Sequence, residues 1–174
     1  QAAASVGYLE KIVDLDLEIR RSYLVRPYSV QTIENFFESS FPLGLAACYS
    51  GAAQAHYDRE LGLVTVGRAP RRAIFLEPDG SYDINYLASE SDFLKIPAWK
   101  VVQGKIPDSD IRNKAVFIGL RSSLFSDMHP TPFGIMSGIG IHANEFISIL
   151  SGRMLRFVPD QVTQTIAWLV GLCV

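Results

Sequence analysis

Residues 114 to 153 constrain the fold of this chain most, because two apolar runs flank a polar loop there and lead into a helix. The run KAVFIG, residues 114 to 119, is typical of a strand buried on both faces of a sheet. The loop LRSSLFSDMHPTPFG follows, and the second run, IMSGIGI, leads into a helix expected to begin near His142. This order predicts an α/β fold: a mixed or mostly parallel sheet with flanking helices and a β-hairpin.

One apolar stripe runs along the predicted helix. The stripe consists of Ala143, Phe146, Ile147 and Leu150. The other faces carry His142, Glu145 and Ser148. Gly152 is placed to end the helix, because glycine readily adopts the left-handed conformation common after a last helical turn.

Two further helices are predicted in the first third of the chain. Ser29 caps a run with helical spacing of apolar residues as far as Phe41, where Pro42 sets a boundary. The alanine-rich stretch from Leu45 to Leu61 favours a second helix, since alanine has the highest intrinsic helix preference.

The segments that follow predict strands and a turn. LGLVTV, residues 61 to 66, and RRAIFL, residues 71 to 76, are expected to form a hairpin or meander, and EPDGSY after them is a turn. In KIPAWKVVQGKIP two Ile-Pro pairs bracket a short helix that Gly104 ends.

Composition restricts the classes of function. The 174 residues suit one domain with its own core. A net charge of −2 with scattered basic residues gives no electrostatic surface for nucleic acid. Cys48 and Cys173 lie far apart, so neither a zinc spacing nor a disulfide framework is indicated. A single glycine after the 114–119 strand is too few for a dinucleotide-binding or phosphate-binding loop, and no cofactor is predicted.

The C-terminal segment VTQTIAWLVGLCV is uncharged. A helix that spans a membrane needs about 20 apolar residues, so this segment is too short alone but suits the first part of a longer span. Composition leaves a buried C-terminal helix equally open.

The loop after Gly119 is the first place to look for a ligand, because ligands collect beyond the carboxyl ends of strands in α/β sheets. The residues expected to bind a ligand or to hold the local structure are Arg121, Ser122, Ser123, Asp127, Thr131, His142 and Asn144. Arg121 is suited to an anionic ligand as a forked donor. His142 is expected first to hydrogen-bond a neighbouring loop and second to contact a ligand.

Catalysis and metal binding receive less support. A hydrolase would use Ser122 or Ser123 as nucleophile, His142 as base and Asp127 as the orienting carboxylate. No G-x-S-x-G turn surrounds either serine, and loop serines commonly bond the backbone instead. His129, His142 and Asp127 lack the short fixed spacing of a metal site. No catalytic residue and no metal ligand are therefore predicted.

Residues 95 to 159 resemble the second type of CHASE domain. The shared motifs are Ile96-Pro97-Ala98, the Gly104-x-Ile106-Pro107 turn, the strand ending in Ile118-Gly119, Asp127 followed by Thr131-Pro132, Gly138, Ile141-His142-Ala143-Asn144 and Ser151-Gly152-Arg153. The resemblance extends more loosely to residues 61 to 66 and the following hairpin. The family usually has proline and glutamate at Ser137 and Gly140, and its N-terminal section has no clear counterpart in residues 1 to 60.

This resemblance implies a non-enzymatic extracytoplasmic sensory domain over residues 1 to 157, followed by the start of a truncated membrane helix over residues 158 to 174. Such a domain relays a small-molecule or protein signal to a cytoplasmic cyclase or histidine kinase domain, and the membrane is a partner through the C-terminal helix. A soluble hydrolase and a ligand-free homodimerisation module are the alternatives.

Overall fold

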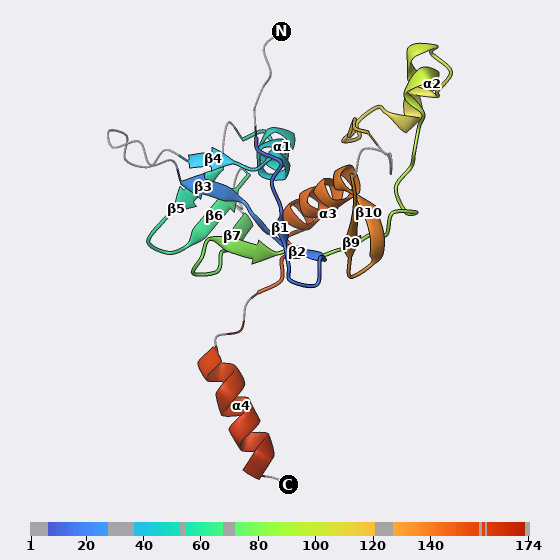
Figure 1. Cartoon of the computed structure of the whole chain (residues 1–174). Helices are drawn as coiled ribbons and strands as arrows, with labels where there is room; N and C mark the ends of the chain where they lie inside the picture. Colours follow the sequence, from blue (N-terminus) through green and yellow to red (C-terminus); the bar gives the residue numbers. More distant parts are fainter. Residues whose placement is uncertain are drawn as a thin grey trace.

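A computed structural model describes residues 7–27, 37–52, 55–67, 72–120, 127–156, 158 and 160–172 of the chain. Strands and helices alternate irregularly along it (Figure 1). In chain order the elements are β1 (Ile12–Val13), β2 (Ile19–Tyr23), β3 (Val25–Pro27), β4 (Phe37–Ser39), α1 (Phe41–Tyr49), β5 (His56–Asp58), β6 (Leu63–Val66), β7 (Arg72–Phe75), β8 (Ser81–Asp83), α2 (Ala98–Val102), the 3₁₀ turn η1 (Asp108–Asp110), β9 (Met128–Thr131), β10 (Gly134–Ser137), α3 (Gly138–Ser151) and α4 (Asp160–Leu172).

The strands form small antiparallel sheets, so the fold is α/β in the broad sense but the expected mixed or mostly parallel sheet is wrong. The strand orders are β1-β2-β8, β3-β4, β5-β6-β7 and β9-β10, and each of these named pairs is antiparallel. Several neighbouring strands are joined by short turns, whereas parallel strands need a crossover of about a dozen residues or more.

The β5-β6-β7 sheet confirms the predicted hairpin or meander. In it Val64 lies opposite Ile74 in the antiparallel ladder, and both side chains are buried. The predicted turn after β7 is also present, with Gly80 at a φ of 84° in the region that favours glycine. Strands β6 and β7 lie in short, mostly apolar runs that Gly67 and Pro70 separate in the sequence, and this local signal was sufficient to predict them.

The first predicted helix is wrong where the structure describes it, because Phe37–Ser39 pair with β3 as strand β4. Residues 28 to 36 of that prediction lie outside the described residues. Pro42 lies in the first turn of α1 instead of ending a helix, a position where its missing N–H costs nothing. The second predicted helix is partly correct, since α1 covers its start and β5 lies within its second half.

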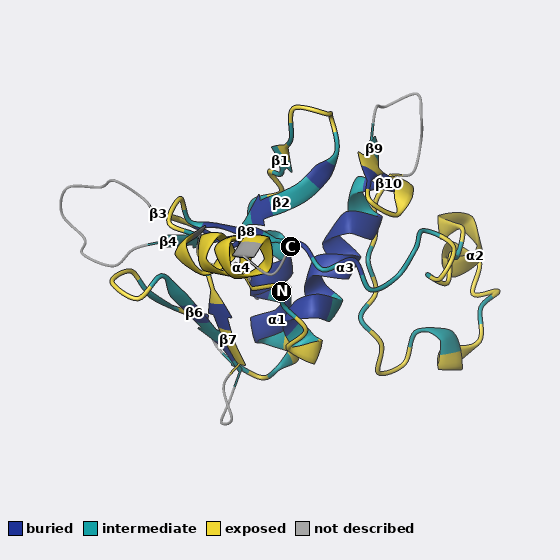
Figure 2. Cartoon of the chain, turned by 90° about the horizontal axis from the view of Figure 1, so that it is seen from below, coloured by how far each residue is buried: buried dark blue, intermediate teal, exposed yellow. Residues whose placement is uncertain are grey.

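Helix α3 forms the centre of the molecule and packs against α1 (Figure 2). It begins one turn before the expected position, because Ser137 is its N-cap and accepts a hydrogen bond from the Gly140 N–H at 3.2 Å. Gly152 ends it in the left-handed region, as predicted, with a φ of 68°. The helix is buried on several sides and not along one stripe, because His142, Glu145 and Ser148 on its other faces are buried as well.

Residues 115 to 120 do not form the predicted doubly buried strand. Phe117 packs edge-on against Phe41 and Phe146, while the alternate residues Val116 and Ile118 are 53% and 91% exposed. The segment therefore packs on one side only, and no strand in the described residues pairs with it. The short helix predicted before it is confirmed as α2, and Gly104 follows with a φ of 64°.

Helix α4 stands clear of the other elements at the end of an extended link (Figure 1). Its side chains from Gln161 to Gly171 are exposed. Within the described part of the chain, no helix has both the length and the apolar character needed to cross a membrane.

Candidate functional site

A buried carboxylate at the centre of α3 joins three distant segments of the chain. Glu145 is fully buried, and its Oε2 forms an ion pair with Lys11 Nζ. Its Oε1 accepts a hydrogen bond from the Tyr82 hydroxyl at 2.5 Å, and His142 Nδ1 lies 3.2 Å from Oε2. We call Lys11, Tyr82, His142 and Glu145 the buried network.

Local structure explains how these side chains meet. His142 and Glu145 are three residues apart on α3, and side chains at this spacing are neighbours on one helix face. Lys11 comes from the segment before β1, 134 residues away from Glu145 along the chain. Tyr82 comes from the middle of β8, where its side chain points inward and is 2% exposed.

The electrostatics favour an ionised Glu145. Burial alone raises the pKa of this carboxyl, but the Lys11 charge and the hydrogen bond from His142 outweigh it, and the pKa falls to about 2. Burial lowers the pKa of the Lys11 ammonium, and Glu145 opposes that effect. Burial and the nearby carboxylate both raise the pKa of Tyr82. The Tyr82 hydroxyl therefore stays protonated and acts as a donor.

His142 is oriented by Glu145 rather than by a loop. A carboxylate only accepts hydrogen bonds, so the contact requires a proton on His142 Nδ1. The imidazole ring also packs edge-on against the Phe41 ring of α1, with 5.7 Å between ring centroids. Only 10% of the His142 side chain is exposed.

Asn144 connects α3 to the chain after β8. Its Oδ1 accepts hydrogen bonds from the Leu87 and Ala88 N–H groups, both at 2.9 Å. Its Nδ2 donates to the Ala88 carbonyl oxygen at 3.0 Å and to the Gly140 carbonyl oxygen at 3.2 Å. The buried Asn144 side chain thus provides hydrogen-bond partners for the backbone groups of Leu87 and Ala88.

The start of α3 is held by two carboxylate residues from different loops. Glu90 Oε2 accepts hydrogen bonds from the Ser137 N–H and hydroxyl, at 3.2 and 3.1 Å. The Asp127 backbone carbonyl accepts from the Gly138 N–H at 3.0 Å. The two contacts fix the point where β10 becomes α3.

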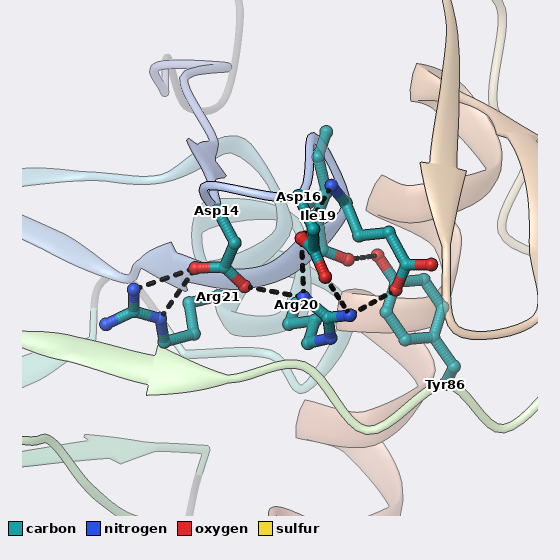
Figure 3. Close-up of polar contacts among 7 residues, drawn as sticks. Asp14, Asp16, Ile19, Arg20, Arg21 and Tyr86 are labelled. Carbon is teal, nitrogen blue, oxygen red and sulfur yellow. Dashed lines mark hydrogen bonds and ion pairs between the residues drawn. The ribbon is translucent and has the colours of Figure 1, made fainter.

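A second charged cluster lies on the β1–β2 hairpin (Figure 3). The Arg20 guanidinium donates to Asp14, Asp16 and Glu18 at 2.5 to 3.2 Å. Arg21 donates to Asp14 through Nη2 at 2.8 Å. These side chains are 17% to 55% exposed and lie close together in the chain, so we assign them a local role in the hairpin turn.

Comparison with known proteins identifies the family. The model of the CHASE2 domain matches residues 1–174, the whole chain. The chain belongs to the CHASE2 domain family. No match was found among curated proteins or among solved structures. The family match also takes in residues 1 to 60, where the sequence motifs alone gave no clear counterpart.

CHASE2 domains are extracytoplasmic, non-catalytic sensory domains of receptors. In this CHASE2 domain those predicted site residues that the structure describes do not converge on one point. His142 points to Glu145 and α1, Asn144 points to residues 87 and 88, and the Thr131 hydroxyl donates to the Gly134 carbonyl oxygen within the β9–β10 turn. Arg121, Ser122 and Ser123 lie outside the described residues.

The geometry gives no support to the catalytic and metal alternatives. The carboxylate partner of His142 is Glu145, whereas the Asp127 carboxylate lies 3.8 Å from His129. The expected orienting acid of a hydrolase is therefore not Asp127. Among the residues that the structure describes, no group of three His, Cys, Asp or Glu side chains could hold a metal ion.

Sequence reasoning missed Lys11, Tyr82 and the central role of Glu145. The one local signal was a histidine three residues before a glutamate on an otherwise apolar helix. Lys11 and Tyr82 join this pair only through long-range folding, which no sequence spacing indicates.

Proposed function

We propose that this CHASE2 domain is the signal-input domain of a transmembrane receptor, and that it relays the binding of a small molecule or partner to a cytoplasmic cyclase or histidine kinase domain. Membership of a sensory family supports the input role. The relay is supported by one observation: the helix that carries the buried network also leads to the C-terminal helix.

Contacts along α3 support its role as the relay. Glu145 ties its middle to the N-terminal segment, and Ser148 donates to the Asn85 carbonyl oxygen at 2.5 Å. Asn85 Nδ2 in turn donates to the Arg153 carbonyl oxygen at 2.6 Å, just beyond Gly152. A shift of α3 would therefore move the link to α4.

A ligand drives such a relay only if it binds one arrangement of α3 better than the other. A buried ion pair suits two discrete arrangements, because an intermediate position would leave a buried charge unpaired. In this proposal the domain faces the extracytoplasmic side of the membrane, and α4 forms the start of a membrane-spanning helix. The absence of charged residues from Gln161 to Leu172 supports this placement.

The test compares two serines of α3 in the full receptor. Ser148→Ala removes the buried bond to Asn85, while the control Ser151→Ala changes an exposed serine that bonds only within the helix. We expect S148A to change basal or stimulated cyclase or kinase output severalfold and S151A to leave it unchanged, at equal surface expression. Unchanged output in S148A and in a His142→Gln, Asn144→Ala double variant would contradict the proposed relay.

Ligand-free homodimerisation is the second candidate, and exposed apolar side chains on α2 and in the segments before and after it favour it. These side chains are Leu94, Trp99, Val101, Val102, Val116, Ile118 and Leu120. Isolated exposed apolar residues are ordinary, but exposed apolar residues that gather in one patch commonly mark an interaction surface. Sedimentation would favour this candidate if the native chain is a dimer and an Ile118→Asp variant is a monomer. Normal receptor signalling without a ligand would be the second observation in its favour.

A further inference from the structure

A cavity of about 300 Å³ lies between the β7–turn–β8 segment and the link to α4. Phe75, Glu77 and Asp83 line one side of it, and Leu155 and Arg156 line the other. This volume is at the lower end of the range for small-molecule sites, so the cavity suits a small ligand. None of the described residues 127 to 132 of the loop considered above is among the lining residues.

The cavity has more negative than positive charge on its walls. Glu77 and Asp83 contribute carboxylates, and Arg156 contributes the one guanidinium among the lining residues. Neither carboxylate forms an ion pair with a basic side chain in the described part of the chain. Arg21, the basic residue opposite Asp83 on β2, is held by Asp14 instead (Figure 3).

The pKa of Glu77 reflects the crowding of negative charge around the cavity. Burial, and then the neighbouring Asp83 and Asp79 carboxylates, raise its pKa. Asp79 itself stays ionised, because it accepts hydrogen bonds from the Ser81 hydroxyl and N–H, which lower its pKa. An added positive charge in the cavity would relieve this repulsion.

An aromatic face in the cavity already holds a cation of the chain. The Arg156 guanidinium carbon lies 5.3 Å from the centre of the Phe75 ring. This distance is within the range of a cation–π contact, which is weak at an exposed position. The Phe75 ring is 52% exposed, so Arg156 is a replaceable occupant.

We propose that this cavity binds a small organic cation, an amine or amidine with an apolar body, which takes the place of Arg156 over Phe75 and pairs with Glu77 and Asp83. The apolar walls formed by Phe75 and Leu155 cover the body of the ligand. The two carboxylates neutralise its charge. Displacement of Arg156 releases the link from β7.

The position of the cavity connects this ligand to the proposed relay. Tyr82 lines the cavity and donates its hydroxyl hydrogen to Glu145, so a ligand that contacts Tyr82 is one hydrogen bond away from α3. Leu155 and Arg156 precede α4 in the chain. The role of the cavity as the sensory input rests on the function proposed above, whereas binding itself does not.

The experiment measures binding of benzamidine to the 174-residue chain by isothermal titration calorimetry, with neutral benzamide as the matched ligand. We expect benzamidine to bind and benzamide to bind at least tenfold more weakly. Arg156→Ala removes the competing guanidinium and tightens benzamidine binding roughly two- to fivefold. Glu77→Gln and Asp83→Asn each weaken it roughly two- to fivefold.

Glu60→Gln is the control, because it removes one carboxylate from an exposed turn outside the cavity. E60Q should bind benzamidine as the native chain does, and circular dichroism establishes that each variant is folded. Equal binding of benzamide and benzamidine, or native affinity in folded E77Q and D83N, would overturn the site. The calorimetry involves no output domain, so a failure of benzamidine binding would leave the proposed sensory function untouched. Benzamidine binding without any change in receptor output would contradict only the relay.

Discussion

At the scale of single residues, Glu145 determines how the N-terminal segment is held. A carboxylate with no exposed surface is tolerated only when other groups replace the water it has lost. Lys11, Tyr82 and His142 do so together, and each comes within hydrogen-bond distance of one of the two carboxylate oxygens. Removal of any one of these partners therefore lowers the free energy of unfolding by more than the contribution of the lost hydrogen bond.

Lys11→Met leaves the Glu145 carboxylate buried without a cation. We expect it to lower the free energy of unfolding by about 3 to 5 kcal/mol, measured by urea denaturation. Lys114→Met changes an exposed lysine and should stay within about 0.5 kcal/mol of the native value. The double variant K11M/E145Q should recover much of the loss, since it buries no charge. A K11M chain as stable as K114M would show that the ion pair has no net effect.

The pKa of Glu145 makes stability depend on pH in a defined range. Because the carboxyl titrates at about 2 in the folded chain and at 4.5 ordinarily, its stabilising effect is complete above pH 4.5 and is lost as the pH falls toward 2. The stability difference between the native chain and Glu145→Gln should thus shrink by about 3 kcal/mol over this range. Urea denaturation at several pH values measures it, and parallel curves for both chains would refute the assignment.

At the scale of elements, the start of α3 shows which parts of the fold could be predicted. The end at Gly152 was predicted correctly, because a glycine after the last helical turn is a local signal. The start was placed too late, because Ser137 lies inside the apolar run IMSGIGI and its capping role was hidden there. Strands β6 and β7 lie in short, mostly apolar runs separated by Gly67 and Pro70, which is also a local signal.

The failures share one physical cause, which is long-range packing. Of the helix predicted from Ser29 to Phe41, the described residues Phe37–Ser39 form strand β4 instead, because they pair with β3. Glu145 was predicted to lie away from the apolar stripe of the helix, and β8 and the N-terminal segment cover the face that carries it. The ligand roles of Arg121, Asp127 and Asn144 remain predictions.

Gly140→Ala tests the close approach of α3 to Glu90. An added Cβ would lie 2.6 Å from Glu90 Oε2 and 2.9 Å from Met136 Cγ, so the carboxylate that holds Ser137 must move. Although alanine is the better helix former, we expect a loss of about 1 to 3 kcal/mol in the free energy of unfolding. The usual glutamate of the family at this position would require the same movement.

Gly171→Ala is the control for this prediction, because a Cβ there has no atom within 4 Å and α4 makes no comparable packing contact. It should leave the urea midpoint unchanged. A G140A chain with the native urea midpoint would contradict the close approach.

At the scale of the whole molecule, α4 lies apart from the body of the domain, on the far side of the link that follows α3 (Figure 1). The 13 residues of α4 extend about 20 Å, less than the apolar core of a bilayer, which is about 30 Å thick. Its exposed apolar side chains include Ile166, Leu169 and Val170, and these have no cover from the body of the domain. A lipid surface is the environment that fits them best.

Insertion of α4 into lipid can be followed through Trp168, which is 75% exposed. The chain has two tryptophans, so Trp99→Phe leaves Trp168 as the one reporter. We expect phosphatidylcholine–phosphatidylglycerol vesicles to shift its fluorescence to shorter wavelength, and brominated lipid chains to quench it. Ile166→Lys in the W99F background places an ammonium in the middle of α4 and should weaken partitioning about 100-fold, since a central lysine costs about 3 kcal/mol. An emission spectrum unchanged by vesicles, or the same shift with and without the lysine, would show that α4 packs elsewhere.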